Sequence, residues 1–391
     1  MILFENALKM ALQTGKTLGI EKIDFMSSVG KVLAEDIQSD INMPPFDKSA
    51  MDGYACRHQD IGNKLTVIET IAAGYFPKKQ IQKNECAKIM TGAPVPKGAD
   101  TVIMVEHTRK LSENKIIYLG DSSASNVCKL AEDVKKGDVV LKKGTLLQPR
   151  HIPVLASVGA TEVLVYKSPK VAIISTGNEL VEPRFKPESS QIRNSNAYQL
   201  ISQARQLGLE AEYMGIAKDT MEDTRKILVE ACRKADIIIL SGAVSMGDFD
   251  FIPLVLKEMK INVLFHGVQT KPGKRTIFGI SENKWFIGLP GNPVSTFVQF
   301  EMLVKPLIYK IMGTGYQTPV YRMPLNDDYH RKKAIRKAFE PVVFTEDGKV
   351  KQVEYHGSAH IHSLSYAQAF MVIEPGVNTI KKGELADVRP I

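Results

Sequence analysis

Cysteine is scarce in this chain of 391 residues, and its four cysteines are widely spaced with no CxxC pair among them: Cys56, Cys86, Cys128 and Cys232. Their spacing argues against a structural zinc site and against a disulfide framework. No basic stretch followed by an apolar one opens the chain, so we expect no signal peptide. No uncharged apolar run approaches the ~18 residues of a membrane span. We therefore expect a cytoplasmic protein without a membrane partner.

Negative charge is in the minority, since the formal net charge is +8. The lysines are scattered through turns such as Lys78-Lys79 and Lys135-Lys136, and no basic helix with interleaved aromatic residues is found. This pattern is typical of a solvated surface rather than of a nucleic-acid interface. We expect no nucleic-acid partner, and a small anionic substrate fits the sign of the charge better.

The length is too great for one ordinary core and favours two to four domains. Residues 4–14 have the apolar spacing of a short amphipathic helix. Residues 44–136 are rich in proline, glycine and short β-like runs, which predicts a β-dominated module.

From Lys170 the pattern changes to alternating strands and helices. We expect strands over 171–175, 210–216, 236–240, 261–266, 276–280 and 285–289, and helices over 196–207, 219–235, 252–259 and 294–312. Such alternation predicts a doubly wound, mostly parallel sheet. After Tyr316 the pattern returns to β, with a hairpin predicted between 339–344 and 350–355.

Two runs near the front of the chain have neither a helical nor a strand period. They are residues 44–55 and 89–100, and both place turn-forming residues around apolar ones. Loops of this kind hold polar groups at fixed places. Asp47, Ser49 and Asp52 are the polar groups of the first run, although such residues also bond to their own backbone in ordinary turns.

Four glycine-containing turns each follow a predicted strand of the α/β segment: residues 176–179, 241–248, 271–274 and 289–293. In open α/β sheets ligands bind beyond the carboxyl ends of the strands, and glycine lets backbone N–H groups approach an anion. The turns carry both acidic and basic residues, which suits a phosphorylated ligand held with Mg²⁺. The structural alternative for Asp219 is the N-cap of the following helix.

At this point the sequence resembles the molybdopterin molybdenumtransferase (MoeA) family, which includes the gephyrin E-domain. The resemblance covers nearly the whole chain and rests on the phrases at 46–55, 90–96, 175–180, 192–196, 271–274 and 288–294. It implies a multidomain α/β plus β protein. The implied parts are a central α/β domain resembling the molybdopterin adenylyltransferase fold, a loop-rich β second domain and a small C-terminal β-barrel-like domain.

The resemblance implies four domains. Residues 1–43 plus 137–168 are expected to form an elongated α+β dimerisation domain, 44–136 the second domain, 169–315 the molybdopterin-binding domain and 316–391 the C-terminal domain. The family also implies a homodimer whose active cleft combines the α/β domain of one chain with the second domain of the other.

The reaction implied is insertion of molybdate into the dithiolene of adenylated molybdopterin, with Mg²⁺-dependent release of AMP. The residues carried over as catalytic are Asp52, Thr91, Glu179, Asp219, Asp250, Lys271 and Lys274. Glu179, Asp219 and Asp250 are also the expected ligands of Mg²⁺. The residues carried over as binding are Asp133, Ser241, Gly242, Pro290, Gly291, Pro293, Arg336 and Ser358.

Five positions depart from the family pattern: Lys48 replaces a usual Asn, Cys128 an Arg, Ala131 and Ala243 a Gly, and Arg275 a Pro. The Cys128 change removes an anion contact, which Lys48 or Arg275 is able to replace by its charge. The molybdopterin adenylyltransferase and acceptor molybdoenzymes are the protein partners implied. Two other functions stay open at this point: a molybdopterin adenylyltransferase, and a non-catalytic molybdopterin-binding scaffold.

Overall fold

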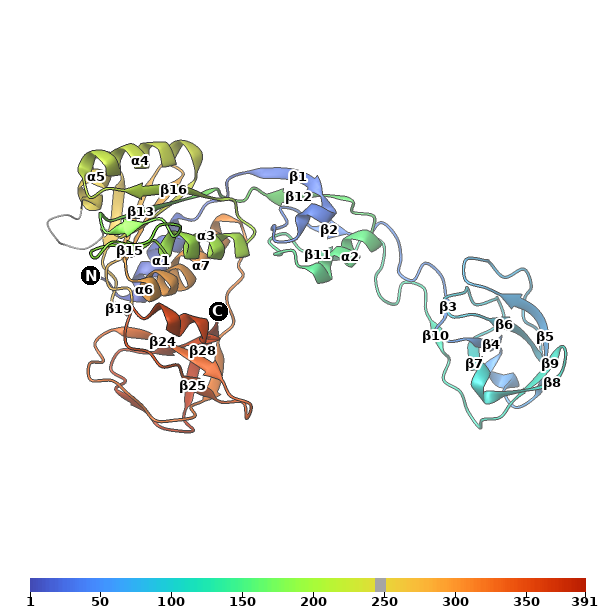
Figure 1. Ribbon diagram of the computed structural model, residues 1–391. Helices are drawn as coiled ribbons and strands as arrows, with labels where there is room; N and C mark the ends of the chain where they lie inside the picture. The colour runs from blue at the N-terminus through green and yellow to red at the C-terminus, as the bar shows by residue number, and fades with distance from the viewer. Residues whose placement is uncertain (243–250) are drawn as a thin grey trace. The chain divides into compact units, whose positions relative to one another are not determined.

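The computed structural model describes residues 1–242 and 251–391, which form two compact units (Figure 1). The first unit contains residues 1–34, 144–148 and 163–391, and the second contains 35–143 and 149–162. No helix of the described residues is long and apolar enough to cross a membrane. The division of the chain into four domains stays a prediction.

A six-stranded sheet is the centre of the first unit, with strand order β16-β13-β17-β21-β20-β18. Its strands are β16 (Ala211–Ala217), β13 (Val171–Thr176), β17 (Ile237–Ser241), β21 (Lys284–Leu289), β20 (Ile277–Ser281) and β18 (Asn262–His266). The first four strands are parallel, and β20 runs antiparallel to both of its neighbours. The predicted mostly parallel sheet is therefore confirmed.

Helices cover both faces of this sheet because its central strands are apolar on both sides. Ile173 and Ile239 face a core that includes residues of α1 (Phe4–Thr14), α3 (Asn196–Gln206), α6 (Pro293–Gln299) and α7 (Lys305–Ile311). Ile174 and Leu240, one residue further along, face α4 (Met221–Lys234) and α5 (Ile252–Glu258). Successive side chains of a strand point to opposite faces, so a strand buried on both sides has no polar alternation.

The predicted long helix at 294–312 is helical without interruption from Pro293 to Ile311, but it is not α-helical throughout. A π-helical turn at Phe300–Val304 separates α6 from α7. Pro306 lies in the first turn of α7 and has no N–H to donate to the preceding turn, which fits the change in hydrogen-bond spacing there.

The end of the chain forms a second sheet of the first unit, in the order β19-β24-β26-β28-β22. These strands are β19 (Thr270–Lys271), β24 (Lys337–Phe344), β26 (Ala369–Ile373), β28 (Leu385–Pro390) and β22 (Tyr321–Pro324). β25 (Val350–Gln352) pairs antiparallel with β24, which confirms the predicted hairpin. β19 joins this sheet although it precedes β20 of the central sheet, so the segment around Lys271 connects the two sheets.

The second unit is dominated by β structure, as the sequence predicts. Its sheet has the order β7-β4-β6-β5-β9-β8, with strands β7 (Thr101–Met104), β4 (Gly53–Cys56), β6 (Glu85–Ile89), β5 (Lys64–Ile71), β9 (Lys115–Tyr118) and β8 (Thr108–Ser112). Beside it, β3 (Lys48–Ser49) pairs antiparallel with β10 (Val127–Cys128). The four cysteines of the chain are free thiols, two of them buried.

Candidate functional site

Three parallel strands of the central sheet end side by side. Ser175 of β13 pairs in register with Ser241 of β17, and Ser241 pairs with Leu289 of β21. After β13 the chain forms α3 on one face of the sheet and then enters β16. From β16 it continues through α4 on the other face and enters β17. The connections therefore diverge between β13 and β17, which is where open α/β sheets bind ligands.

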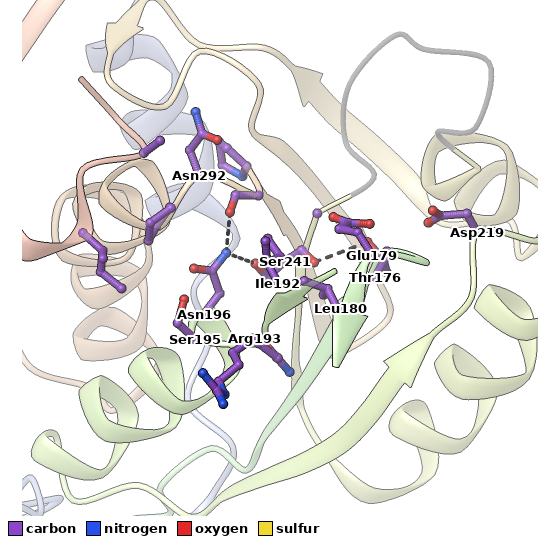
Figure 2. Close-up of a pocket in the computed structure, with 18 of the residues that line it drawn as sticks. Thr176, Glu179, Leu180, Ile192, Arg193, Ser195, Asn196, Asp219, Ser241 and Asn292 are labelled. Atoms are coloured by element: carbon purple, nitrogen blue, oxygen red, sulfur yellow. Dashed lines mark hydrogen bonds between the residues drawn. The ribbon is translucent and has the colours of Figure 1, made fainter. Parts of the chain in front are cut away.

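A cavity of about 740 Å³ lies at these strand ends (Figure 2). Its wall comes mainly from the turns that follow the three strands, from the segment before α3 with the first residue of α3, and from two residues of the C-terminal part of the chain. Asp219, after β16, and Arg275, before β20, complete it. The lining residues are Thr176, Gly177, Glu179, Leu180, Ile192, Arg193, Asn194, Ser195, Asn196, Asp219, Ser241, Gly242, Arg275, Pro290, Gly291, Asn292, Pro293, Ala359 and Ile361.

Two glycines keep the floor of this cavity open. Gly242 has a φ of +100°, and a Cβ atom there would lie 2.5 Å from the backbone oxygen of Thr176. Gly177 has a φ of +145°, and its Cβ would lie 2.5 Å from Glu179 Oε2. A positive φ favours glycine at both positions, and at Gly242 a side chain would also clash with the backbone. The carboxylate of Glu179 is thereby able to fold back over the end of β13.

Two buried asparagines hold the wall in place. Asn196 Nδ2 donates to Ser241 Oγ at 2.8 Å and to the Gly291 carbonyl at 2.7 Å, so one amide joins the ends of β17 and β21 to the start of α3 (Figure 2). Asn194 Oδ1 accepts from Ser175 Oγ at 3.0 Å and from Ala197 N at 3.3 Å. Asn194 therefore caps α3, whereas Ser195, directly before the helix, makes no capping bond.

The acidic side of the cavity contains Glu179 and Asp219 (Figure 2). Asp219 Oδ2 accepts from Asn178 N at 3.1 Å, and Asn178 Oδ1 accepts from Asp219 N at 3.2 Å. The structural alternative for Asp219 is wrong, because the N-cap of α4 is Thr220, whose hydroxyl accepts from Asp223 N at 3.2 Å. Asp219 is thus free of a capping role.

Glu179 and Asp219 are residues that would hold a Mg²⁺ ion at this cavity. They offer hard oxygen donors at one end of the cavity, and Mg²⁺ is commonly held by one or two carboxylates together with substrate phosphate oxygens. The cleared space above Gly177 leaves the Glu179 carboxylate room at the strand end. The third expected ligand, Asp250, and the departure at Ala243 lie outside the described residues.

Positive charge reaches the cavity through two arginines, Arg193 and Arg275. Neither was among the expected site residues. Arg275 was visible as a departure from the family pattern, and Arg193 belongs to the phrase 192–196 that carries the resemblance. The sequence also gave no role to Thr176, Asn194, Asn196 and Asn292, which line the wall. A residue that supports a turn by hydrogen bonds leaves no motif by which a single sequence would reveal it.

The C-terminal part of the chain is tied to this wall by Asn292. Asn292 Nδ2 donates to Ser358 Oγ at 2.7 Å, and the Ser358 carbonyl accepts from Val294 N at 3.1 Å. Ser358 is half-buried, and its neighbour Ala359 lines the cavity. The structure therefore brings Ser358 to the cavity edge together with the expected Pro290, Gly291 and Pro293.

The expected lysines do not line this cavity. Lys271 Nζ lies 3.6 Å from Glu340 Oε1, and the Glu340 side chain is only 7% exposed. Lys274 is exposed. Arg336 donates from Nη1 to the Thr270 carbonyl at 2.9 Å. The structure thus gathers Lys271 and Arg336 around β19, apart from the residues that line the cavity.

In the second unit the two unusual runs meet. Asp52 Oδ1 accepts from Thr91 N at 2.7 Å and from Thr91 Oγ1 at 3.0 Å. The bond from the Thr91 backbone, followed by the bond from its hydroxyl, lowers the pKa of Asp52 below its ordinary value. Asp52 is exposed, so this carboxylate is fixed in position and accessible.

The same unit also fixes Asp47 and Lys48. Asp47 accepts from Leu130 N at 2.8 Å and from Lys129 Nζ at 3.0 Å, and these bonds lower its pKa. Lys48 is the register partner of Cys128 across β3 and β10. Asp133 is exposed, and its backbone N–H donates to the Met43 carbonyl at 3.0 Å. The roles of these residues in binding stay predictions.

Comparisons with known proteins agree over the whole chain. Family models match as the MoeA N-terminal region (domain I and II) over residues 2–159, a probable molybdopterin binding domain over 172–310, and the MoeA C-terminal region (domain IV) over 322–391. The chain is similar to a protein from Haemophilus influenzae named molybdopterin molybdenumtransferase, with 37% identity over 95% of this chain and 93% of that protein.

A protein of the same name from Staphylococcus epidermidis is 32% identical over 98% of this chain and 94% of its own length. Among solved structures, a molybdopterin biosynthesis MoeA protein from Pyrococcus horikoshii OT3 superposes with a TM-score of 0.85 at 31% identity, over the full length of both chains. This chain belongs to the molybdopterin molybdenumtransferase (MoeA) family.

Proposed function

We propose that this chain is a molybdopterin molybdenumtransferase of molybdenum cofactor biosynthesis, which inserts molybdate into the dithiolene of adenylated molybdopterin and releases AMP. Family membership supports the reaction class. The observation that carries the proposal to particular residues is the cavity at the ends of β13, β17 and β21, which is lined by two carboxylates and two arginines.

Water is the co-substrate of the cleavage step: its oxygen forms a new P–O bond as the phosphoanhydride P–O bond breaks, and its protons are released. AMP leaves, and molybdopterin keeps its own phosphate. Mg²⁺, when bound, offsets the negative charge of the phosphate oxygens. Glu179 and Asp219 are the residues that would hold it, with Asp250 as the third expected ligand. Arg275 and Arg193 supply positive charge on the same cavity, which favours a transition state whose negative charge increases.

Lys271 and Arg336 are proposed to hold molybdate. Both are cationic, and both are fixed around β19, Lys271 by the carboxylate of Glu340 and Arg336 by the Thr270 carbonyl. Ser358 supplies a hydroxyl at the cavity edge. Lys274 is exposed and adds positive charge two residues after Pro272.

The proposal includes a homodimer in which Asp52 and Thr91 of one chain serve the reaction in its partner. A mixing experiment tests this. Asp52→Ala and Glu179→Ala proteins, each inactive alone, are unfolded together and refolded, and AMP release is measured. A mixed dimer has one site with both residues intact, so activity should return in part. No return of activity in dimers shown to be mixed would refute the sharing.

One assay separates the proposed reaction from its alternatives. Purified protein is given adenylated molybdopterin, Mg²⁺ and molybdate, and AMP is measured. Molybdate-dependent AMP release is expected, and its absence contradicts the proposal. Consumption of ATP with unmodified molybdopterin would indicate an adenylyltransferase instead, and binding without any turnover would indicate a scaffold. Replacing molybdate with tungstate in the same assay measures the preference between the two oxyanions.

A further inference from the structure

A second hollow lies beside the cavity, on the other side of the segment before α3. Its volume is about 920 Å³, and its wall includes Pro183, Arg184, Tyr198 and Tyr213. We call it the tyrosine groove. Arg193, Asn194 and Ser195 line both the groove and the cavity, so the two hollows share one wall.

The two tyrosine rings of the groove are held by a chain of hydrogen bonds. Tyr198 Oη donates to Glu182 Oε2 at 2.8 Å, and Tyr213 Oη donates to Glu182 Oε1 at 2.7 Å. Tyr213 Oη also accepts from Asn194 Nδ2 at 2.8 Å. Glu182 raises the pKa of Tyr198, and burial together with Glu182 raises the pKa of Tyr213, so both hydroxyls stay protonated and keep donating.

The series of hydrogen bonds that holds the two tyrosines begins at the floor of the cavity. Asn194 is 1% exposed, and its Oδ1 accepts from Ser175 Oγ at the end of β13. One buried amide therefore fixes the end of β13 on one side and Tyr213 on the other. The polar atoms of both tyrosines are used within the protein, so what the groove offers a ligand is mainly ring surface.

One of the two rings, Tyr198, is an exposed platform, whereas Tyr213 is partly buried and packs against the core. Their centroids are 5.8 Å apart with planes tilted by 46°, and Tyr198 is 44% exposed. Arg193 borders them, with its Nε donating to the carbonyls of Pro183 and Phe185 at 3.0 and 3.1 Å. The exposed ring of Tyr198 beside a fixed guanidinium group suits a flat heterocycle, which stacks on that ring and accepts hydrogen bonds at its edge.

We propose that the tyrosine groove binds the fused heterocycle at one end of the adenylated substrate, while the charged middle of that substrate lies in the cavity. This inference rests on the proposed function. A substrate with a flat ring at each end and phosphates between them needs an apolar compartment next to a charged one. The shared wall of Arg193, Asn194 and Ser195 provides that arrangement.

The test uses two simple probes, AMP and pterin-6-carboxylate, because the ring could come from the adenine end or the pterin end. Binding of each probe to the full-length protein is measured by calorimetry, for wild type and for Tyr198→Ala, Tyr198→Phe and Tyr321→Ala. Tyr321 is a matched control, since it is 50% exposed and lies on β22, away from the groove.

Tyr198→Ala should weaken one probe about tenfold, because base–aromatic stacking is lost. Tyr198→Phe and Tyr321→Ala should bind that probe as wild type does, and the probe affected identifies the ring. The inference is overturned when wild type binds neither probe, or when Tyr198→Ala binds both as tightly as wild type. Either result leaves molybdate-dependent AMP release to be judged by its own assay, so failure of the groove and failure of the proposed function are distinguishable.

Discussion

Asp52 and Thr91, 39 residues apart in the sequence, are joined by two hydrogen bonds to a single carboxylate oxygen, Asp52 Oδ1. They come from the two runs whose composition is unlike that of a helix or a strand. The contact explains that composition, because each run must hold a polar group at a set place without regular structure.

Thr91→Val should raise the pKa of Asp52 only part of the way to its ordinary value. The substitution removes the hydroxyl bond and leaves the backbone bond, which is the larger cause of the lowered pKa. A lowered pKa in the folded state means that this contribution to stability is present above the unfolded value of about 3.9 and is lost as pH falls through the folded pKa. An NMR titration of the Asp52 carboxyl carbon measures the pKa of both proteins. A full return of this pKa to its ordinary value would contradict the larger contribution of the backbone hydrogen bond.

Lys48→Met should reduce kcat/KM for molybdate about fivefold, and adding Cys128→Arg to that variant should restore it. Lys48 and Cys128 are register partners on β3 and β10, so a cation on either residue occupies nearly the same place. Lys48 is half-buried rather than enclosed, and charges in contact with solvent act with modest energies, which sets the size of the effect. If the double variant is no better than Lys48→Met, the lysine does not replace the missing arginine.

Asp219→Asn and Thr220→Ala should affect different properties, although the residues are adjacent: the first should lower activity and the second should lower stability. Thr220 caps α4, so Thr220→Ala should lower the free energy of unfolding by about 1 kcal/mol and leave AMP release nearly unchanged. Asp219→Asn should leave stability nearly unchanged and lower AMP release at limiting Mg²⁺ about tenfold. Chemical denaturation and the AMP assay on the same preparations check both. If both variants lose the same amount of stability, Asp219 has a structural role like that of Thr220.

Ala131→Gly should stabilise the protein by about 1 kcal/mol. Ala131 has a φ of +58°, a left-handed conformation that costs an L-residue with a Cβ roughly 1–2 kcal/mol and costs glycine little. Its backbone N–H donates to the Pro44 carbonyl, so the native conformation is held by the surrounding loop. Denaturant unfolding of the two proteins gives the difference, and a destabilised glycine variant would show that unfolded-state entropy outweighs the strain.

The central sheet was predictable because its signal is local. Residues 171–175 and 237–240 are continuous apolar runs, and they form the buried strands β13 and β17. Helix ends were less predictable, since adjacent polar residues compete for one cap. Asn194 rather than Ser195 caps α3, and Thr220 rather than Asp219 caps α4.

The candidate site was predictable where a turn follows a strand. Glu179, Ser241, Gly242 and Pro290 line one cavity because the carboxyl ends of parallel strands lie at one sheet edge. The same reasoning failed for Lys271. That residue belongs to β19, which pairs with β24 of another sheet, so its turn does not follow a strand of the central sheet. Strand partners distant in sequence leave no local pattern.

Glu179→Gln tests the central claim most directly, because it removes one negative charge from the cavity with almost no change in shape. Glu179 is exposed, so the variant should unfold at the same denaturant concentration as wild type. Molybdate-dependent AMP release from adenylated molybdopterin should fall about 10- to 100-fold and recover in part at high Mg²⁺. Undiminished release by the folded variant would contradict the assignment of this cavity as the active site.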